Sequence, residues 1–431
     1  IEEREQVEEY LEKILSEIEN SSAEKLSDEK TDNKLPESTG TQDDFSKAFF
    51  KAAKEHNDAD EESGSSEEDK EKNTKNKIIL AIVAVIAAIA VICGVYFGVF
   101  YNKEADEPST IPPETETVTE APAVILNPLT GEAGYNKAAV GKRPVSVVID
   151  NAAGARPQYN MSAADIVVEG EVEGGETRML WFFSDITNLP AQIGPTRSAR
   201  PSFVEFSQFF DSFYVHFGGS HSKGNYVGGY EVIKNNHVDD IDGMSVSSCF
   251  KRTSDKASPH NAVLLGDNLI AAIEKKNYRT DINENAFASF GFNEKKQPVS
   301  DVPCSNASVK ISSKTNTHKF TYNSSEQVYT NEADYKAAVS FTNIIVMYAD
   351  STYIDKQDYK GSGKTETYLN YKFTSGSGKL ISCGTAVDFN WNVSNGRLCF
   401  TDASGNELKL NPGKSWIALA SANHNGSVTI S

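Results

Sequence analysis

Basic residues and cysteine are both scarce in this chain of 431 residues. Its 42 lysine and arginine residues are outnumbered by 61 aspartate and glutamate residues, which gives a formal net charge of -19. This acidic balance argues against a protein that binds nucleic acid, because a polyanion is bound through positive charge. An apolar share of 39% is nevertheless sufficient for a folded core, and the length predicts roughly two or three domains.

Only five cysteines occur, and none has the C-x-x-C spacing of a zinc site, so we expect neither a metal centre nor a cofactor. Cys93 lies within an apolar segment. Cys383 and Cys399 flank an expected hairpin and could form a disulfide across it. Cys249 and Cys304 would then remain for a second disulfide. The spacing alone leaves open whether either disulfide forms.

The acidity is concentrated in two segments. Residues 1–77 carry 24 acidic and 12 basic side chains, and residues 102–140 carry seven acidic and two basic ones. Residues 141–431 are left with a net charge of only -2. The large C-terminal part is therefore nearly neutral, and the charge of the whole chain describes mainly the segments that precede it.

A segment without any charged residue, from Ile78 to Tyr101, separates the two acidic segments. As a helix that rises about 1.5 Å per residue, it would exceed the roughly 30 Å hydrocarbon layer of a membrane. Lysines precede this segment, whereas acidic residues follow it closely. The positive-inside rule then places residues 1–77 in the cytoplasm and residues 102–431 outside it. We therefore predict a single-pass transmembrane helix over residues 78–101 that anchors the protein in the cell membrane.

The cytoplasmic segment predicts one amphipathic helix in an otherwise disordered region. Apolar residues between Val7 and Ile18 recur at spacings of three and four, which forms one stripe along a helix. This stripe could pair with itself or bind a cytoplasmic partner protein, and the sequence does not separate these alternatives. On the outer side, residues 102–126 are rich in proline, threonine and glutamate, which is typical of a disordered spacer.

The remaining residues predict two folded domains of the α+β class. In residues 127–300, strand-length runs alternate with helical stretches at 202–210, 228–236 and 267–276, which predicts a mixed α/β domain. The runs lie at 144–150, 165–171, 178–183 and 212–217. Residues 301–431 contain short alternating runs separated by turns such as Asn395-Gly396, which predicts a mostly antiparallel β domain.

Several polar clusters between residues 143 and 261 carry a resemblance to a known family. They include Asp150-Asn151, ADIVVEGEVEGG at 164–175, RSAR at 197–200, GGS at 218–220 and SPHN at 258–261. Together with LNPGKSWI at 410–417, these motifs resemble the YerB-type family of bacterial envelope proteins. The resemblance implies an N-terminal domain of unknown function followed by the C-terminal domain of the family. It implies an envelope location but no reaction, and the predicted transmembrane helix here replaces the lipidated cysteine of the usual members.

The same clusters contain residues suited to binding an anion. Arg178, Arg197 and Arg200 carry guanidinium groups that can grip phosphate or carboxylate with two hydrogen bonds. The loop at 218–224 could present backbone N–H groups to the same anion. The other candidate ligand-binding residues are Asp150, Asp165, Glu169, His216 and Ser220.

Each of these candidates also has a purely structural explanation. A buried network of arginines and carboxylates can simply fix a fold, and SPHN can form a turn around a hydrogen-bonded histidine. Two functions are therefore open. One is a non-enzymatic envelope module that binds a cell-wall component or an envelope protein. The other is an envelope enzyme or phosphate-ligand binder that uses the arginines, and it would be excluded if internal carboxylates fully consumed the three arginine side chains.

Overall fold

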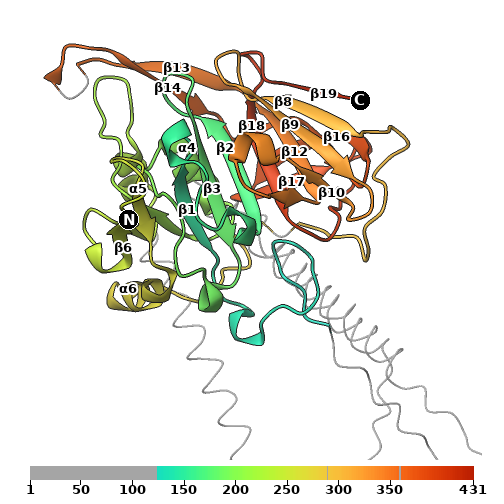
Figure 1. Cartoon of the computed structure of the whole chain (residues 1–431), viewed down its shortest axis with the longest axis horizontal. Coiled ribbons are helices and arrows are strands. Elements are labelled where there is room, and N and C mark those ends of the chain that lie inside the picture. Colours follow the sequence, from blue (N-terminus) through green and yellow to red (C-terminus); the bar gives the residue numbers. More distant parts are fainter. Residues whose placement is uncertain (1–123, 289, 359–360) are drawn as a thin grey trace, which may run out of the picture. The chain divides into compact units, whose positions relative to one another are not determined.

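The computed structural model describes residues 124–288, 290–358 and 361–431 (Figure 1). The predicted cytoplasmic segment, the predicted transmembrane helix and nearly all of the predicted spacer lie outside these residues. Within the described part of the chain, no helix is both long enough and apolar enough to cross a membrane. The single-pass anchor over residues 78–101 therefore stays a prediction.

A ten-stranded mixed sheet forms the centre of the described part, in the order β17-β16-β15-β12-β18-β2-β3-β1-β4-β5. Its strands are β1 (Val145–Asp150), β2 (Ile166–Glu171), β3 (Thr177–Phe183), β4 (Phe213–His216), β5 (Asp240–Asp242), β12 (Asn343–Ala349), β15 (Ser375–Ser382), β16 (Thr385–Ser394), β17 (Arg397–Thr401) and β18 (Ser415–Ser421). Parallel pairing of β18 with β2 carries the sheet across the predicted domain boundary at residue 300. Both predicted domains thus contribute strands to one sheet.

Both faces of this sheet are covered, which explains why β1, β2 and β18 are buried along their whole length. Helix α4 (Pro201–Gln208) packs one of its aromatic side chains, Phe206, near Phe182 on one face. Helices α5 (Gly229–Asn235) and α6 (Leu269–Lys275) lie farther along the chain. On the other face, Phe320 of a second sheet lies 4.8 Å from Trp416, centroid to centroid.

The second sheet has five antiparallel strands in the order β11-β10-β9-β8-β19. These strands are β8 (Asn306–Lys310), β9 (Thr317–Asn323), β10 (Val328–Thr330), β11 (Ser340–Phe341) and β19 (Ser427–Ile430). In β9, buried and exposed residues alternate, as expected for a strand with one face on the core. The short helix α7 (Glu332–Tyr335) follows β10.

Two separate hairpins complete the fold. Strands β13 (Ser351–Lys356) and β14 (Glu366–Tyr371) form a two-stranded antiparallel sheet of their own. Strands β6 (Phe250–Arg252) and β7 (Ala262–Leu264) form another. The β13–β14 hairpin extends at the top of Figure 1, from the orange C-terminal part over the green N-terminal part. Short 3-10 helices connect the other elements, at 137–139, 153–155, 161–163, 186–188, 247–249 and 266–268.

The structure confirms the predicted fold class in outline: a mixed α/β part is followed by a β-rich C-terminal part. The runs at 144–150, 165–171, 178–183 and 212–217 correspond to β1 to β4, and the helical stretches correspond to α4, α5 and α6. The turn at Asn395-Gly396 joins β16 to β17, with positive φ at both residues, as two-residue hairpin turns require.

Neither of the two possible disulfides is present, because all four cysteines of the described residues are free thiols. In the hairpin register, Cys399 of β17 lies opposite Asn392, whereas Cys383 lies in the turn at the other end of β16. The length of β16 therefore keeps these two residues apart. The thiols of Cys249 and Cys304 donate to different carbonyl groups, those of residues 268 and 306.

Phe320 links the two sheets, so we expect Phe320→Ala to lower the free energy of unfolding by about 3–5 kcal/mol. The ring is buried against Trp416 and Phe341, and its removal leaves a cavity between the sheets. Urea unfolding followed by tryptophan fluorescence measures this loss. The neighbouring exposed residue provides a control, since Lys319→Ala should change the free energy by less than about 0.5 kcal/mol. Equal effects of the two substitutions would contradict the packing.

Candidate functional site

The three predicted arginines line one cavity of about 490 Å³. Arg178 belongs to β3, and Arg200 is the residue that precedes the first turn of α4. The segment with Arg197 is fixed beside β1, because the backbone N–H of Arg197 donates to the carbonyl of Val148 at 2.9 Å. The other residues around the cavity are Glu173, Ser198, Gly219, Ser220, His221, Pro259, Lys356 and Tyr368.

Glu173 binds two of the arginines at once. Its Oε1 lies 2.5 Å from Nη2 of Arg178, and its Oε2 accepts a hydrogen bond from Nε of Arg200 at 2.8 Å. Burial alone would raise the pKa of Glu173, but the two guanidinium groups outweigh burial and hold the pKa at about 2. Burial and the charge of Arg200 lower the pKa of Arg178 to about 10, which leaves this side chain charged at neutral pH.

Arg197 is the arginine with spare hydrogen-bonding capacity. Its Nε lies 3.2 Å from Oδ2 of Asp150, and its side chain is 27% exposed. Its Nη1 and Nη2 atoms have no hydrogen bond or ion pair with any residue that the structure describes. These two nitrogens, which form the end of the guanidinium fork, are available to an anion in the cavity.

Lys356 and Tyr368 reach the cavity from the β13–β14 hairpin. A bridge between Glu173 and Tyr368 attaches β14 to the segment after β2, and the backbone N–H of Leu369 donates to the carbonyl of Val172 at 2.7 Å. Nζ of Lys356 donates to the carbonyl of His221 at 2.7 Å. Burial lowers the pKa of Lys356. The hairpin thus adds a fourth cation to the cavity.

The cavity holds more positive than negative charge. Three guanidinium groups and the ammonium group of Lys356 face the carboxylate of Glu173, and Asp150 pairs with Arg197 at the edge. Internal carboxylates therefore do not neutralise all of the cations. Each of the three arginines pairs with a carboxylate, but Arg178 and Arg200 share Glu173 and Arg197 keeps two nitrogens without a partner among the described residues, so the three side chains are not fully consumed.

Ser220 lines the cavity, but its hydroxyl group already serves the loop that carries it. The Oγ atom accepts hydrogen bonds from the hydroxyl of Tyr226 and from the backbone N–H of Gly229, both at 2.8 Å. It also lies 3.4 Å from the carbonyl of Ala199, to which it donates. These contacts fix the loop before α5 and leave the hydroxyl without a role as a nucleophile.

His216 does not line the cavity and is completely buried. Its Nδ1 lies 2.7 Å from the carbonyl of Gly218, and its Nε2 lies 3.1 Å from the carboxylate of Asp240. Both ring nitrogens are thus occupied within the protein. His216 holds β4, β5 and the loop after β4 together.

Glu169 belongs to a second buried ionic cluster, between the two sheets. Its carboxylate lies 2.9 Å from Nε2 of His318 and accepts a hydrogen bond from the hydroxyl of Tyr335 at 2.8 Å. Burial alone would lower the pKa of His318, but the charges of Glu169 and Asp334 raise it to about 9. The pKa of Glu169 is lowered, since His318 outweighs the opposite effect of burial.

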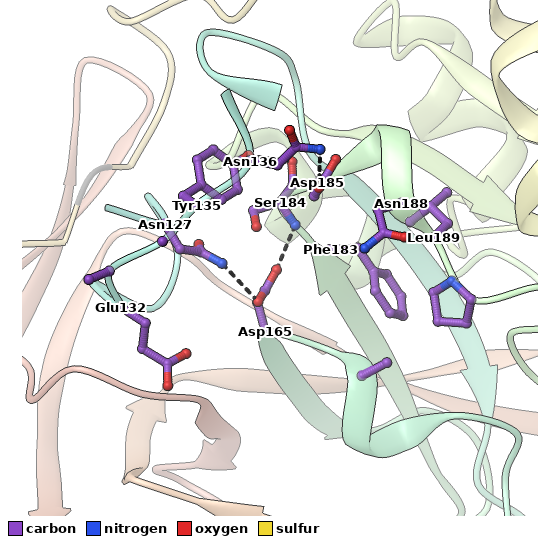
Figure 2. Close-up of a pocket in the computed structure, with 14 residues that line it drawn as sticks. Asn127, Glu132, Tyr135, Asn136, Asp165, Phe183, Ser184, Asp185, Asn188 and Leu189 are labelled. Carbon is purple, nitrogen blue, oxygen red and sulfur yellow. Dashed lines mark hydrogen bonds between the residues drawn. The ribbon is translucent and has the colours of Figure 1, made fainter. Parts of the chain in front are cut away.

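Asp165 lies at a different cavity of about 510 Å³, which shares no lining residue with the arginine cavity. Figure 2 shows Asp165 between Asn127 and Ser184, which both donate to its carboxylate. Burial raises the pKa of Asp165. The surrounding amides and carboxylates include Glu132, Asn136, Asp185 and Asn188. The structure therefore separates Asp165 from the arginines, whereas it brings Asp150 and Ser220 to them.

Sequence reasoning missed the contributions of the hairpin and the pairing of His260. Lys356 and Tyr368 lie in a segment with no motif, so no local signal marks them. A turn around a hydrogen-bonded histidine was expected at 258–261, but not its partner: Nδ1 of His260 lies 2.8 Å from Oδ2 of Asp150. The spacing between these two residues contains no indication that they meet. Among the described residues, no group of three histidine, cysteine or acidic side chains is arranged to hold a metal ion.

Two family models match this chain. The N-terminal domain of "Protein of unknown function (DUF3048)" matches residues 129–279, and its C-terminal domain matches residues 307–417. YerB of Bacillus subtilis (strain 168), whose name designates a lipoprotein, is 29% identical over 321 residues, which cover 71% of this chain and 89% of YerB. The chain belongs to the YerB-type family.

A crystal structure of the Bacillus subtilis YerB protein supports this assignment in three dimensions. It is similar to this chain with a TM-score of 0.56 and 27% identity, over 71% of this chain and 99% of that one. Residues from both domains of the YerB-type family line the arginine cavity. Its three arginines lie in the N-terminal family domain, and Lys356 and Tyr368 lie in the C-terminal family domain.

Because one carboxylate, that of Glu173, pairs with both Arg178 and Arg200, its removal should destabilise the protein. Glu173→Gln leaves Arg178 and Arg200 buried without a counter-charge, so we expect the free energy of unfolding to fall by about 3–5 kcal/mol. Phosphate added to this variant should recover part of the loss, because an anion can replace the carboxylate. Urea unfolding with and without phosphate measures both effects. The exposed Glu176 provides the matched control, and a Glu173→Gln loss as small as that of Glu176→Gln would contradict the network.

The Glu169–His318 pair predicts a pH-dependent stability. The pKa of His318 is raised from its ordinary value of about 6.5 to about 9. Charged His318 therefore stabilises the folded protein fully below about pH 6.5, and this contribution to the free energy of unfolding, about 3 kcal/mol, is lost as the pH rises through 9. The difference in unfolding free energy between the wild type and His318→Gln, measured from pH 6 to pH 10, should shrink over this interval. A constant difference would show that His318 carries no charge in the folded protein.

Proposed function

We propose that this protein is a membrane-anchored binding module on the outer face of the cell membrane, and that its arginine cavity binds a phosphate-bearing component of the cell envelope. One observation carries the proposal. Arg178 of β3, and Arg197 and Arg200 of the segment that leads into α4, face one cavity together with Lys356. Their charge exceeds that of the internal carboxylates, so an anionic ligand completes the site.

Phosphate fits this cavity for two physical reasons. The fork of Arg197, with two unoccupied nitrogens, matches two oxygens of a phosphate group. Glu173 holds Arg178 and Arg200 in place before a ligand arrives, so little side-chain entropy is lost on binding. The cavity thus offers an ordered set of donors rather than flexible surface cations.

A membrane location follows from two independent lines of support. The charge-free segment 78–101 is long enough to span a bilayer, and the lysines before it favour a cytoplasmic N-terminus. The relative YerB carries the designation of a lipoprotein, which is another way of holding a domain at a membrane. The acidic spacer would hold the binding module away from the lipid surface, and the amphipathic stripe between Val7 and Ile18 would bind a partner in the cytoplasm.

Titration of the purified chain in detergent with glycerol phosphate tests the proposed ligand class. We expect glycerol phosphate to bind saturably and acetate not to displace it. We expect Arg197→Ala to weaken the binding of glycerol phosphate by about 10–100-fold, the effect of losing a charged hydrogen-bonding group. Arg279→Ala is the control, because Arg279 is exposed and pairs with Asp211 outside the cavity. Binding that is insensitive to Arg197→Ala, or no binding at all, would contradict the proposal.

A further inference from the structure

His260 and Asp150 form a hydrogen-bonded pair next to the arginine cavity, although neither side chain lines it. Nδ1 of His260 lies 2.8 Å from Oδ2 of Asp150, and the same oxygen lies 3.2 Å from Nε of Arg197. The carboxylate of Asp150 is almost completely buried, and its other oxygen accepts the backbone N–H of Ala152 at 3.0 Å. A fixed carboxylate therefore joins the imidazole ring to an arginine of the cavity.

This pairing determines what the imidazole ring can do. Because the carboxylate accepts a hydrogen bond from Nδ1, the neutral ring keeps its lone pair on Nε2. Nε2 has no hydrogen bond with any residue in the described ranges, and the side chain is 25% exposed. Pro259, directly before His260, lines the cavity. An oriented proton acceptor thus lies next to a cluster of cations.

The backbone holds the ring in this orientation from one side. Gly154 packs against the imidazole so closely that a Cβ atom there would lie 3.1 Å from Cδ2 of His260. A carboxylate that orients an imidazole, whose second nitrogen is accessible, is the arrangement by which enzymes build a general base. The adjacent cations supply what such a base needs beside it, a site that stabilises negative charge on a reacting group.

We propose that the cavity hydrolyses a phosphomonoester, with His260 as the general base and Asp150 as the residue that positions it; this rests on the proposed phosphate site. The oxygen of a water molecule forms a bond to phosphorus while the bond from phosphorus to the ester oxygen breaks. Nε2 of His260 takes a proton from the attacking water and later releases it to solvent, while the departing oxygen, on the opposite side of phosphorus, takes a proton from solvent water. The products are an alcohol and inorganic phosphate.

The charge of the cavity favours a monoester over a diester. Four cations, those of the three arginines and Lys356, face the two carboxylates of Glu173 and Asp150, which leaves an excess of two positive charges. The phosphate of a monoester carries nearly two negative charges at neutral pH, whereas a diester carries one. Glu366 accepts a hydrogen bond from the hydroxyl of Tyr368 and lies opposite Lys356 in the β13–β14 register, where its charge acts on Lys356. It does not line the cavity, and this sum counts only the groups at the cavity.

The test measures hydrolysis of p-nitrophenyl phosphate and binding of inorganic phosphate on the same full-length chain in detergent. In His260→Asn, the amide nitrogen can take the place of Nδ1 against Asp150, while Nε2 is lost. We expect turnover to fall at least about 100-fold, with phosphate binding changed by less than about twofold. Exposed His237 lies outside the cavity, so His237→Asn is the control and should keep full turnover. In His260→Ala, added imidazole should restore part of the turnover.

We expect Asp150 to act by positioning His260, and the kinetics of Asp150→Asn distinguish this positioning role from a purely structural role. Asp150→Asn allows the wrong tautomer of the imidazole, so it should lower kcat far more than it changes KM. An equal change in both constants would overturn the positioning role.

The remaining outcomes are decisive in different ways. Phosphate binding without hydrolysis by the wild type overturns this inference and leaves the proposed binding function in place. Absence of phosphate binding overturns both. Wild-type turnover in His260→Asn overturns the role of His260, and hydrolysis of bis(p-nitrophenyl) phosphate without hydrolysis of p-nitrophenyl phosphate overturns the assignment to monoesters.

Discussion

The parallel pairing of β2 with β18 is the constraint on which the rest of the described structure depends. It runs from Ile166 opposite Ser415 to Gly170 opposite Leu419 and merges strands of both family domains into one sheet. Because β18 also pairs with β12, the hairpin that follows β12 emerges beside the end of β2. The bridge between Glu173 and Tyr368 then fixes the hairpin there. The shared sheet and this bridge together hold residues of the C-terminal domain at the arginine cavity.

The protein contains two clusters of buried charged residues, and they differ in whether their charges balance. Glu169 and His318 pair with each other in a buried cluster, and this cluster ties the two sheets together. Glu173 likewise satisfies Arg178 and Arg200, but Arg197 and Lys356 leave the arginine cavity with surplus positive charge. Burying ions is costly unless they are paired, so an unbalanced cluster is expected where a ligand supplies the missing charge.

Much of the fold was predictable because its signals are local. Runs of β-branched and aromatic residues marked β1 to β4, and Asn395-Gly396 marked the turn between β16 and β17. The disulfides were not predictable in the same way, because the distance between Cys383 and Cys399 depends on strand register. The site was predicted in part: the guanidinium chemistry of Arg197 and Arg200 was evident. The pairing of Asp150 with His260 required the folded chain.

The sequence alone determined where charge and apolar segments lie, which family motifs are present and which side chains can grip an anion. These properties depend on residue type and on neighbours a few positions away. Only the tertiary structure decided which cations share a cavity and which are neutralised, and it separated Asp165 and Glu169 from the arginines. Those outcomes depend on cross-strand register and on the path of a hairpin such as β13–β14. Contacts between residues far apart in the chain set both, and no short stretch of sequence encodes them.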